Sequence, residues 1–380
     1  MRKDNSFLFI NTFDPVVPIF NDLAKSLSIK GYTCFALVSS CSYRPSVASQ
    51  YINYIQVPSF GFKNKRICSI IYFMLAPIFI FIYRKYSVIY FSQPPLFYIF
   101  GGLLSKLCGS TFFIHVMDLY PDLLINKFKT NLVLKILKKL SVYVFNSSKG
   151  VIVIGDCMKD KLLSRGVFSN LLIKIPNWPN MSLLSHCVSK NNFSDRYKLN
   201  NKFVITYTGN MGYFHEFGSI INAAKFLSDN LDILFVFVGS GVSRKYISNH
   251  TSSLNNVLLL DFLPFDQLID LYKITSLHFV SLKEGYEGLM VPSKFYGLIA
   301  SGKPILYQGN SCSEISNIIN NSSCGTVYDS NTSHLHEIIT QYYNSPVLCN
   351  THGANAYNCF LNNYHPSMLI NRYTSFLINS

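Results

Sequence analysis

Short apolar runs alternate with stretches of helical periodicity along the first part of the chain. Such runs are typical of strands buried on both faces of a parallel sheet, whereas apolar residues spaced three or four apart indicate helices. The pattern predicts strands at residues 6–10, 34–39, 88–91, 111–116, 150–154 and 173–176. It predicts helices at residues 20–29, 98–107, 131–144 and 158–164. Strands that alternate with helices in this way favour parallel βαβ units.

A second series begins after a polar stretch without periodicity, residues 184–202, which we interpret as an interdomain linker. Its strands are predicted at residues 203–208, 233–238, 257–260, 277–280 and 304–307, and its helices at 218–228, 265–273 and 293–300. Because 380 residues exceed what one core usually holds, we predict an α/β protein with two Rossmann-like domains and a cleft between them. The domains are 1–185 and 186–355, and a helical tail, 356–380, is a candidate to return to the first domain.

Residues 67–83 form an uncharged apolar segment with two basic residues on each side, Lys65–Arg66 and Arg84–Lys85. At a rise of about 1.5 Å per residue, a helix of this length barely matches a hydrocarbon core of about 30 Å. Pro77 would also kink such a helix. Three interpretations remain open: a helix that lies on or dips into a membrane, a buried core helix, and a membrane span.

The composition limits the classes of binding partner that are expected for this chain. A net charge of +14 suits anionic lipid or phosphate-bearing substrates. Nucleic acid is not expected, because the chain has no zinc-finger spacing, aromatic ribonucleoprotein motif or dense basic helix. The first residues lack a signal-peptide cleavage site, so a cytoplasmic protein is expected. The ten cysteines form no C-x-x-C pair, which predicts reduced thiols without disulfides or structural metal.

Two loops carry candidate phosphate-binding chemistry. The first, YTGNMGYFHEF at residues 207–217, follows a strand and precedes a helix, and its glycines Gly209 and Gly212 would let backbone amides approach an anion. A turn at Gly239 and Gly241 ends the next strand in the same way. Taken singly, each is also compatible with an ordinary tight turn. Glycine-rich turns that share the carboxyl edge of one sheet favour a ligand site.

The second loop is KEGYEGLMVPSK, residues 283–294, ahead of a predicted helix. Glu284 and Glu287 can accept hydrogen bonds from sugar hydroxyls, and Lys294 can neutralise phosphate. A nucleotide sugar requires both kinds of group. The plain alternative is a surface loop with two solvated carboxylates.

Four segments in order resemble one enzyme family: HVMDLYPD at 115–122, KIPNWPN at 174–180, YTGNMG at 207–212 and EGLMVPSKFYGLIASGKP at 287–304. The chain resembles the family 4 retaining glycosyltransferases of the GT-B fold, in particular the WbuB-like branch that builds O-antigen and related polysaccharides. The resemblance implies transfer of a hexosyl or N-acetylhexosaminyl group from a nucleoside diphosphate sugar to a polyprenyl-diphosphate-linked glycan. It also implies a peripheral protein on the inner face of the bacterial cytoplasmic membrane.

The resemblance assigns roles by position. It implies catalytic roles for Asp118 or His115 and for Glu287, although His115 is equally compatible with a buried histidine inside a strand. It places the nucleotide sugar on Gly209, Asn210, Gly212, His215, Gly239, Gly241, Gly288, Leu289, Val291, Ser293 and Lys294. Many relatives have Arg and Lys where this chain has Asn210 and His215, so we assign the positive charge to Lys294 and a protonated His215. A second family glutamate corresponds to Gly297, which leaves the ribose contact open.

Two other functions remain as alternatives: a nucleotide-sugar 2-epimerase with the same fold, and a non-catalytic partner subunit. No metal cofactor is expected, because amides and Lys294 can supply the positive potential and no Asp-x-Asp pair is evident. The string of His334, His336 and Glu337 resembles a metal site but shows no further ligand in the sequence.

Overall fold

The computed structural model describes residues 5–10, 18–40, 49–91, 96–128, 131–179, 193–329 and 334–380. The chain forms two compact units. Unit 1 comprises Met1–Asn177, Gly288–Val291 and Ser367–Ser380, and unit 2 comprises Trp178–Glu287 and Pro292–Pro366. The predicted boundary at residues 185 and 186 lies outside the described residues, as do residues 184–192 of the predicted linker. The rest of that stretch, 193–202, belongs to unit 2 and is not a linker, because it holds a short helix and buries Phe193 and Leu199 in a core.

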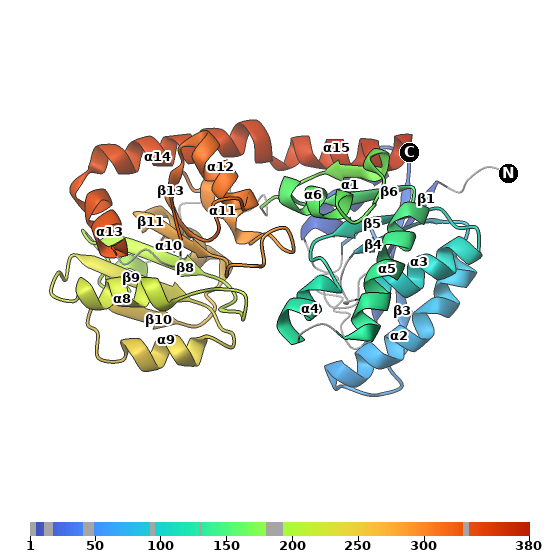
Figure 1. Ribbon diagram of the computed structural model, residues 1–380, viewed down its shortest axis with the longest axis horizontal. Helices are drawn as coiled ribbons and strands as arrows, with labels where there is room; N and C mark the ends of the chain where they lie inside the picture. The colour runs from blue at the N-terminus through green and yellow to red at the C-terminus, as the bar shows by residue number, and fades with distance from the viewer. Residues whose placement is uncertain are drawn as a thin grey trace. The chain divides into compact units, whose positions relative to one another are not determined.

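Unit 1 is built on a seven-stranded parallel sheet in the order β3-β2-β1-β4-β5-β6-β7 (Figure 1). Its strands are β1 Ser6–Ile10, β2 Thr33–Ser39, β3 Asn53–Val57, β4 Ser87–Phe91, β5 Phe112–Val116, β6 Gly150–Val153 and β7 Leu172–Lys174. Its helices are α1 Pro18–Ile29, α2 Lys65–Ile82, α3 Phe97–Leu107, α4 Asp122–Phe128, α5 Leu132–Ser147, α6 Asp156–Leu163 and the C-terminal α15 Pro366–Asn379. Every residue of the interior strand β5 is buried, as its nearly continuous apolar sequence predicts, and His115 is buried with its apolar neighbours.

Unit 2 holds a six-stranded parallel sheet in the order β10-β9-β8-β11-β12-β13 (Figure 1). Its strands are β8 Phe203–Thr208, β9 Ile233–Val238, β10 Val257–Leu260, β11 Leu277–Ser281, β12 Ile305–Gln308 and β13 Gly325–Tyr328. Its helices are α7 Phe193–Arg196, α8 Gly218–Phe226, α9 Arg244–Thr251, α10 Phe265–Ile274, α11 Lys294–Ala300, α12 Glu314–Ser322, α13 Leu335–Asn344 and α14 Pro346–Cys359, which continues into a π-helical turn at Phe360–Tyr364.

Successive side chains of β8 enter two different cores, because a strand alternates its faces. Ile205 and Tyr207 lie in one core with α8 and α13, whereas Val204 lies in the other with Leu271 of α10. The strand order reverses between β8 and β11. In open parallel sheets, ligands bind at the carboxyl edge beside such a reversal, so the loops after β8 and β11 are the place to look for a site.

The predicted strands and helices are confirmed, most of them within two residues at each end. The sequence missed β3, an edge strand with the polar residues Asn53 and Gln56, and β13, which begins at a glycine. It also missed the helices α4, α9 and α12. The tail expected to be helical is α14 and α15, separated by the π-helical turn. Tyr373 of α15 packs against His115 of β5 within unit 1, and Phe376 occupies the space above Gly150.

The apolar segment expected at residues 67–83 is α2, and the helix continues through Pro77. Cys68, Tyr72, Ala76 and Ile80 recur every four residues and are fully buried, so one face belongs to the core of unit 1. The opposite face is apolar but exposed. Among the described residues, no helix combines the length and apolarity needed to cross a membrane.

Candidate functional site

The loop after β8, residues 209–217 (hereafter the Gly209 loop), is fixed by backbone hydrogen bonds. Gly209 has φ +113°, a conformation that favours glycine. Its N–H donates to the carbonyl of Val238 at 2.9 Å, and the N–H of Met211 donates to Ser240 at 2.8 Å. These two amides are already engaged, so Gly209 does not offer an anion a free amide, contrary to the expectation from its motif.

Gly239 and Gly241 serve close packing of the two turns. A Cβ at Gly239 would lie 2.0 Å from the carbonyl oxygen of Gly209, and one at Gly241 would lie 2.5 Å from that of Met211. The N–H of Gly239 also donates to Leu260 at 3.0 Å. These glycines therefore let the turn after β9 support the Gly209 loop from behind.

Lys294, the first residue of α11, is the most unusual charged group of unit 2. Its Nζ is buried and has no hydrogen-bond partner among the described residues. It lies 3.3 Å from the centre of the Tyr207 ring, and its stem passes 3.8 Å from the Cβ position of Gly209. Burial lowers the pKa of Lys294 well below its usual range. An ammonium placed under a glycine loop without a counter-ion is suited to an incoming anion.

His215 is neutral at physiological pH. Its Nδ1 donates to the carbonyl of Ser281 at 2.6 Å, which leaves Nε2 as the unprotonated nitrogen. Burial, together with the nearby charges of Lys294 and Lys283, lowers the pKa of His215 to about 3. The expected protonated His215 is therefore not supported, and Lys294 alone carries the positive charge assigned to this pair.

The other residues of unit 2 that were predicted to bind the nucleotide sugar lie around Lys294. Asn210 is exposed, and its side chain lies between Gly212 and Gly241, 3.0 and 2.6 Å from their Cβ positions. Ser293 precedes α11 without a side-chain capping bond, and Glu287 is half-buried. The structure thus gathers Asn210, Gly212, His215 and Lys294 around the ends of β8 and β11.

The remaining predicted residues belong to unit 1. Asp118 follows β5 and forms a backbone bridge with Met290 of the segment Gly288–Val291, and the N–H of Leu119 donates to Leu289 at 2.7 Å. Leu289 and Val291 are buried, and Gly288 (φ +71°) lies against the backbone of Cys157. The roles of Asp118 and of Gly288–Val291 in donor binding stay predictions.

His115 is part of the core of unit 1. It is 1% exposed, contacts the rings of Phe91 and Tyr373, and accepts or donates a 3.2 Å hydrogen bond with the Tyr373 hydroxyl. Burial lowers the pKa of His115 to about 3. These surroundings favour the interpretation of His115 as a buried core residue over a catalytic role.

Sequence reasoning missed two supporting residues. Tyr207 supplies the ring beneath Lys294, and its hydroxyl donates to the carbonyl of Asn210 at 2.6 Å. Ser281 accepts from His215 through its carbonyl and from the N–H of Glu216 through its hydroxyl. Tyr207 stood in the quoted motif, two residues before Gly209, but strand alternation alone does not reveal which neighbour a buried ring will meet.

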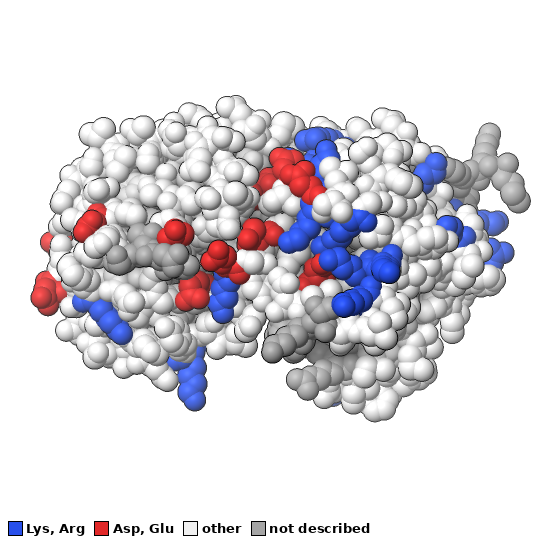
Figure 2. Space-filling model, viewed as in Figure 1, with Lys and Arg blue, Asp and Glu red and all other residues white. Residues whose placement is uncertain are grey.

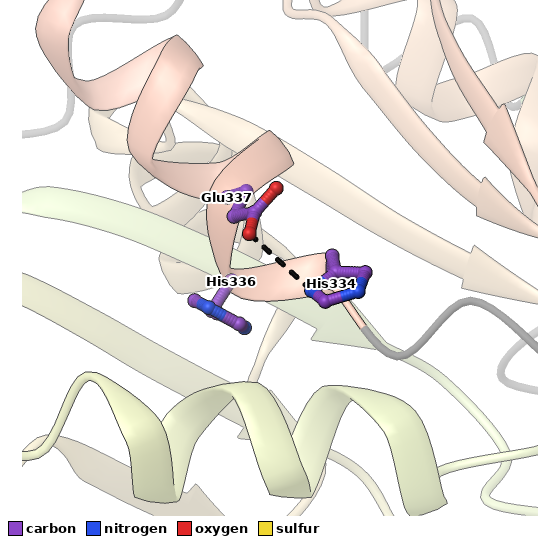
Figure 3. A group of neighbouring side chains, drawn as sticks. All are labelled: His334, His336 and Glu337. Atoms are coloured by element: carbon purple, nitrogen blue, oxygen red, sulfur yellow. Dashed lines mark ion pairs between the residues drawn. The ribbon is translucent and has the colours of Figure 1, made fainter.

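Figure 3 shows the His334, His336 and Glu337 group at the start of α13. Their ligand atoms lie within 4.8 Å of one another, so the structure does bring the three side chains together. His334 pairs with Glu337 at 3.3 Å, and the ring of His336 stacks on Phe226 at 3.6 Å. None of the three contributes to the Gly209 loop, and the expectation that the chain needs no metal stays a prediction.

Two curated proteins are similar to the chain in sequence. WcaI of Escherichia coli (strain K12), provisionally named a colanic acid biosynthesis glycosyl transferase, is 26% identical over 210 residues, which cover 53% of this chain and 51% of WcaI. WbjE of Pseudomonas aeruginosa, named a probable glycosyltransferase, is 26% identical over 240 residues, which cover 62% of this chain and 60% of WbjE. The chain thus matches about half to three fifths of the length of these relatives. No protein-family model matches it.

Solved structures match over nearly the whole chain. Anabaena HepE, crystallised with UDP-glucose, has a TM-score of 0.73 at 13% identity and covers 99% of this chain and 100% of its own. WaaG, a glycosyltransferase involved in lipopolysaccharide biosynthesis, has a TM-score of 0.70 at 13% identity, with 97% and 98% covered. The chain has the GT-B fold. The predicted fold is confirmed, and so is the resemblance to glycosyltransferases of polysaccharide biosynthesis.

Proposed function

We propose that the chain is a polysaccharide-biosynthesis glycosyltransferase. It transfers a hexosyl or N-acetylhexosaminyl group from a nucleoside diphosphate sugar to a lipid-linked glycan, with retention of the anomeric configuration. The observation that carries the proposal is Lys294, whose Nζ is buried against Tyr207 without a hydrogen-bond partner among the described residues. The GT-B fold and the names of the curated relatives support the reaction class.

The chemistry requires the enzyme to stabilise a leaving group. As the bond between the anomeric carbon and the diphosphate oxygen breaks, negative charge grows on the nucleoside diphosphate. The acceptor oxygen forms the new bond to the anomeric carbon, and its proton passes to the departing diphosphate oxygen. A preorganised ammonium is worth more here than in water, because its surroundings are already dry. Lys294 would supply that charge, and the Asn210 amide would add hydrogen-bond donors. Glu287 would accept hydrogen bonds from the sugar.

Nucleotide binding tests the donor half of the proposal. We expect a nucleoside diphosphate, and its sugar ester, to raise the melting temperature of the purified protein in a panel of nucleotides. At about 100 times its dissociation constant a ligand stabilises by about 2.7 kcal/mol. Stabilisation by nucleoside monophosphates or phosphate alone, with no preference for any diphosphate, would contradict the assignment.

Product analysis then separates the transferase from its two alternatives. A transferase forms a glycosylated lipid acceptor from purified protein, nucleotide sugar and membrane lipids extracted free of protein. A 2-epimerase changes the sugar without any acceptor, and a non-catalytic partner subunit forms no product unless a second protein is added.

We also propose that unit 1 docks on a membrane through α2, where a lipid-linked acceptor would reside. The exposed face of α2 carries a stripe of large apolar side chains: Ile70, Met74 and Ile78 are 61%, 71% and 55% exposed, and Phe81 and Ile82 extend the stripe. Exposed apolar patches of this kind mark interaction surfaces. The stripe covers one face of a helix whose other face is core, which suits a helix lying in the interface plane.

Basic groups accompany this stripe. The guanidinium of Arg84 lies over the ring of Phe81 at 4.6 Å, and Lys85 beside it is exposed. On the face drawn in Figure 2, lysine and arginine side chains gather over the part of unit 1 that carries α5 and α6. Anionic lipid attracts such groups at about 1 kcal/mol each, so we expect binding to anionic vesicles that salt weakens.

A further inference from the structure

A cavity of about 720 Å³ opens at the carboxyl edge of the second sheet, beside the Gly209 loop. Its walls come from the ends of three neighbouring strands, with Leu282 after β11, Gln308 at the end of β12 and Asp329 after β13. Glu216 of the Gly209 loop and Ile338 of α13 complete it. Lys294, Asn210 and Gly212 do not line it, so the cavity is not the place assigned above to the diphosphate.

The charges that line the cavity disfavour a phosphate-bearing ligand. Three carboxylates, those of Glu216, Glu284 and Asp329, face one cation, Lys283, which gives a formal balance of −2. The ammonium of Lys283 is also engaged over the ring of Tyr213, 4.5 Å from its centre. An anion placed here would meet like charge, so the ligand is neutral or cationic.

Two fixed polar side chains present unused hydrogen-bonding atoms to the cavity. Gln308 is 2% exposed, and its Oε1 accepts from the hydroxyls of Ser219 at 2.8 Å and Tyr328 at 3.4 Å. Its amide nitrogen has no partner among the described residues. Glu216 uses Oε1 to accept from the N–H groups of Phe217 and Gly218 at the start of α8, and within the described chain its Oε2 accepts from none.

This arrangement matches a hydroxyl group. The amide nitrogen of Gln308 can only donate and the Oε2 of Glu216 can only accept, whereas a hydroxyl does both. Each side chain is held through its Oε1 atom, so neither side chain must be ordered when a ligand arrives. The side chains of Leu282, Val327 and Ile338 add an apolar surface suited to the C–H face of a ring.

We propose that this cavity binds a neutral, hydroxyl-rich sugar ring at a site separate from that of the nucleoside diphosphate. A cavity of this volume lies within the range of small-molecule sites. The proposal extends the proposed transferase function but depends on no step of it, because sugar binding can be measured without nucleotide, acceptor or turnover.

Saturation-transfer NMR on the full chain tests the proposal with defined probes: methyl glucoside, methyl galactoside, methyl mannoside and N-acetylglucosamine, against glucuronate and glucose 1-phosphate. We expect at least one neutral probe to bind, the two anionic probes to bind at least tenfold more weakly, and uridine diphosphate not to compete. Gln308→Met removes the amide while Ser219 and Tyr328 can still bond each other, 3.2 Å apart. This substitution should weaken binding of the neutral sugar at least tenfold.

Two further variants keep the test decisive. Gln341→Met makes the same change at an exposed position of α13 and should bind sugar like the wild type. Glu216→Gln can keep the bonds to α8 while it removes the charged acceptor, so it should weaken the neutral sugar and reduce the bias against glucuronate even if Gln308→Met fails to fold. Binding of none of the neutral probes, preference for an anionic probe, competition by uridine diphosphate, or wild-type binding in both cavity variants would overturn the proposal.

Discussion

Replacing Lys294 by Met tests whether this residue serves ligand binding or the fold. The affinity for nucleoside diphosphate should fall, whereas the melting temperature should stay the same or rise. Met keeps the length of the apolar stem but removes Nζ, which is buried without a hydrogen-bond partner among the described residues. Leaving such a group unpaired costs about 1–3 kcal/mol, and the contact with the Tyr207 ring returns about 0.5–2 kcal/mol. The Lys294→Met protein should therefore melt at the wild-type temperature or a few degrees above it.

Anion binding should instead be lost. A hydrogen bond to a charged group contributes about 1.5–3 kcal/mol, which corresponds to nucleoside diphosphate binding about 10- to 150-fold weaker. His215 cannot compensate, because its pKa of about 3 leaves it neutral. Turnover should fall at least as far, since the same charge is needed when the leaving group departs.

The pH dependence gives a second readout. Burial lowers the pKa of Lys294 in the empty site, and a bound diphosphate raises it again by favouring the ammonium. Between these two pKa values, binding takes up a proton and the affinity falls by up to tenfold per pH unit as the pH rises. The stability of the ligand-free protein should change with pH in the opposite direction. The unfolded chain holds the proton more tightly, so wild-type stability should rise with pH above the folded-state pKa, and Lys294→Met should lose that rise.

Calorimetric titration of uridine and guanosine diphosphate, in two buffers of different ionisation enthalpy, measures affinity and proton uptake together, and a melting series over pH measures stability. Lys225→Met, at an exposed position of α8, is the matched control and should resemble the wild type throughout. Wild-type diphosphate affinity in a folded Lys294→Met protein would refute the reasoning. A melting temperature lowered by more than about 5 °C would show that the ammonium serves the fold.

Three further outcomes are expected. Glu287→Gln should lower kcat by about 100-fold with nucleotide binding nearly intact, and wild-type turnover in the stable variant would remove Glu287 from the site. Turnover should survive chelation by EDTA, whereas a loss restored by magnesium or manganese would show that a divalent ion is required. Met74→Glu, on the exposed face of α2, should abolish sedimentation with anionic vesicles, while Val347→Glu, equally exposed on α14, should not; equal binding of both variants would refute docking through α2.

The sheets could be predicted because their strands are buried on both faces and therefore form apolar runs that the sequence displays directly. The nearly continuous apolar FFIHV of β5 and the six residues of β8 are examples. The edge strand β3 was not predicted because most of it is exposed or half-buried: Val57 alone is buried, and Asn53 and Gln56 are exposed on opposite faces, so its sequence shows no apolar run. Burial on both faces, more than propensity, made the prediction possible.

The site could be predicted only in part, because a motif identifies residues but not what their backbone already does. Gly209 and Gly239 were expected to present amides to a phosphate, yet both amides donate to neighbouring strands, and the missing side chains serve close packing. The neutral state of His215 follows from burial and from the positions of Lys294 and Lys283, and only the folded chain brings these together. Lys294 could be predicted because Asn210 and His215 stand where many relatives have Arg and Lys, so that the positive charge had to come from another residue.

The carboxyl edge of the second sheet offers opposite electrostatic environments over short stretches of chain. Around Lys294 the charge is positive, and its Nζ has no hydrogen-bond partner among the described residues, whereas the cavity is lined by three carboxylates, that of Glu216 among them, and one engaged lysine. A nucleotide sugar joins an anionic part to a neutral, hydroxylated one, and neighbouring sites of opposite preference would keep the two kinds of group from exchanging places. Each environment rests on a residue that its own backbone holds: Lys294 by the start of α11, and Glu216 by the amides that begin α8. Sorting of this kind acts through what each site repels as much as through what it attracts, so charge reversal at Glu216 should both weaken binding of the neutral sugar and reduce the discrimination against anionic sugars.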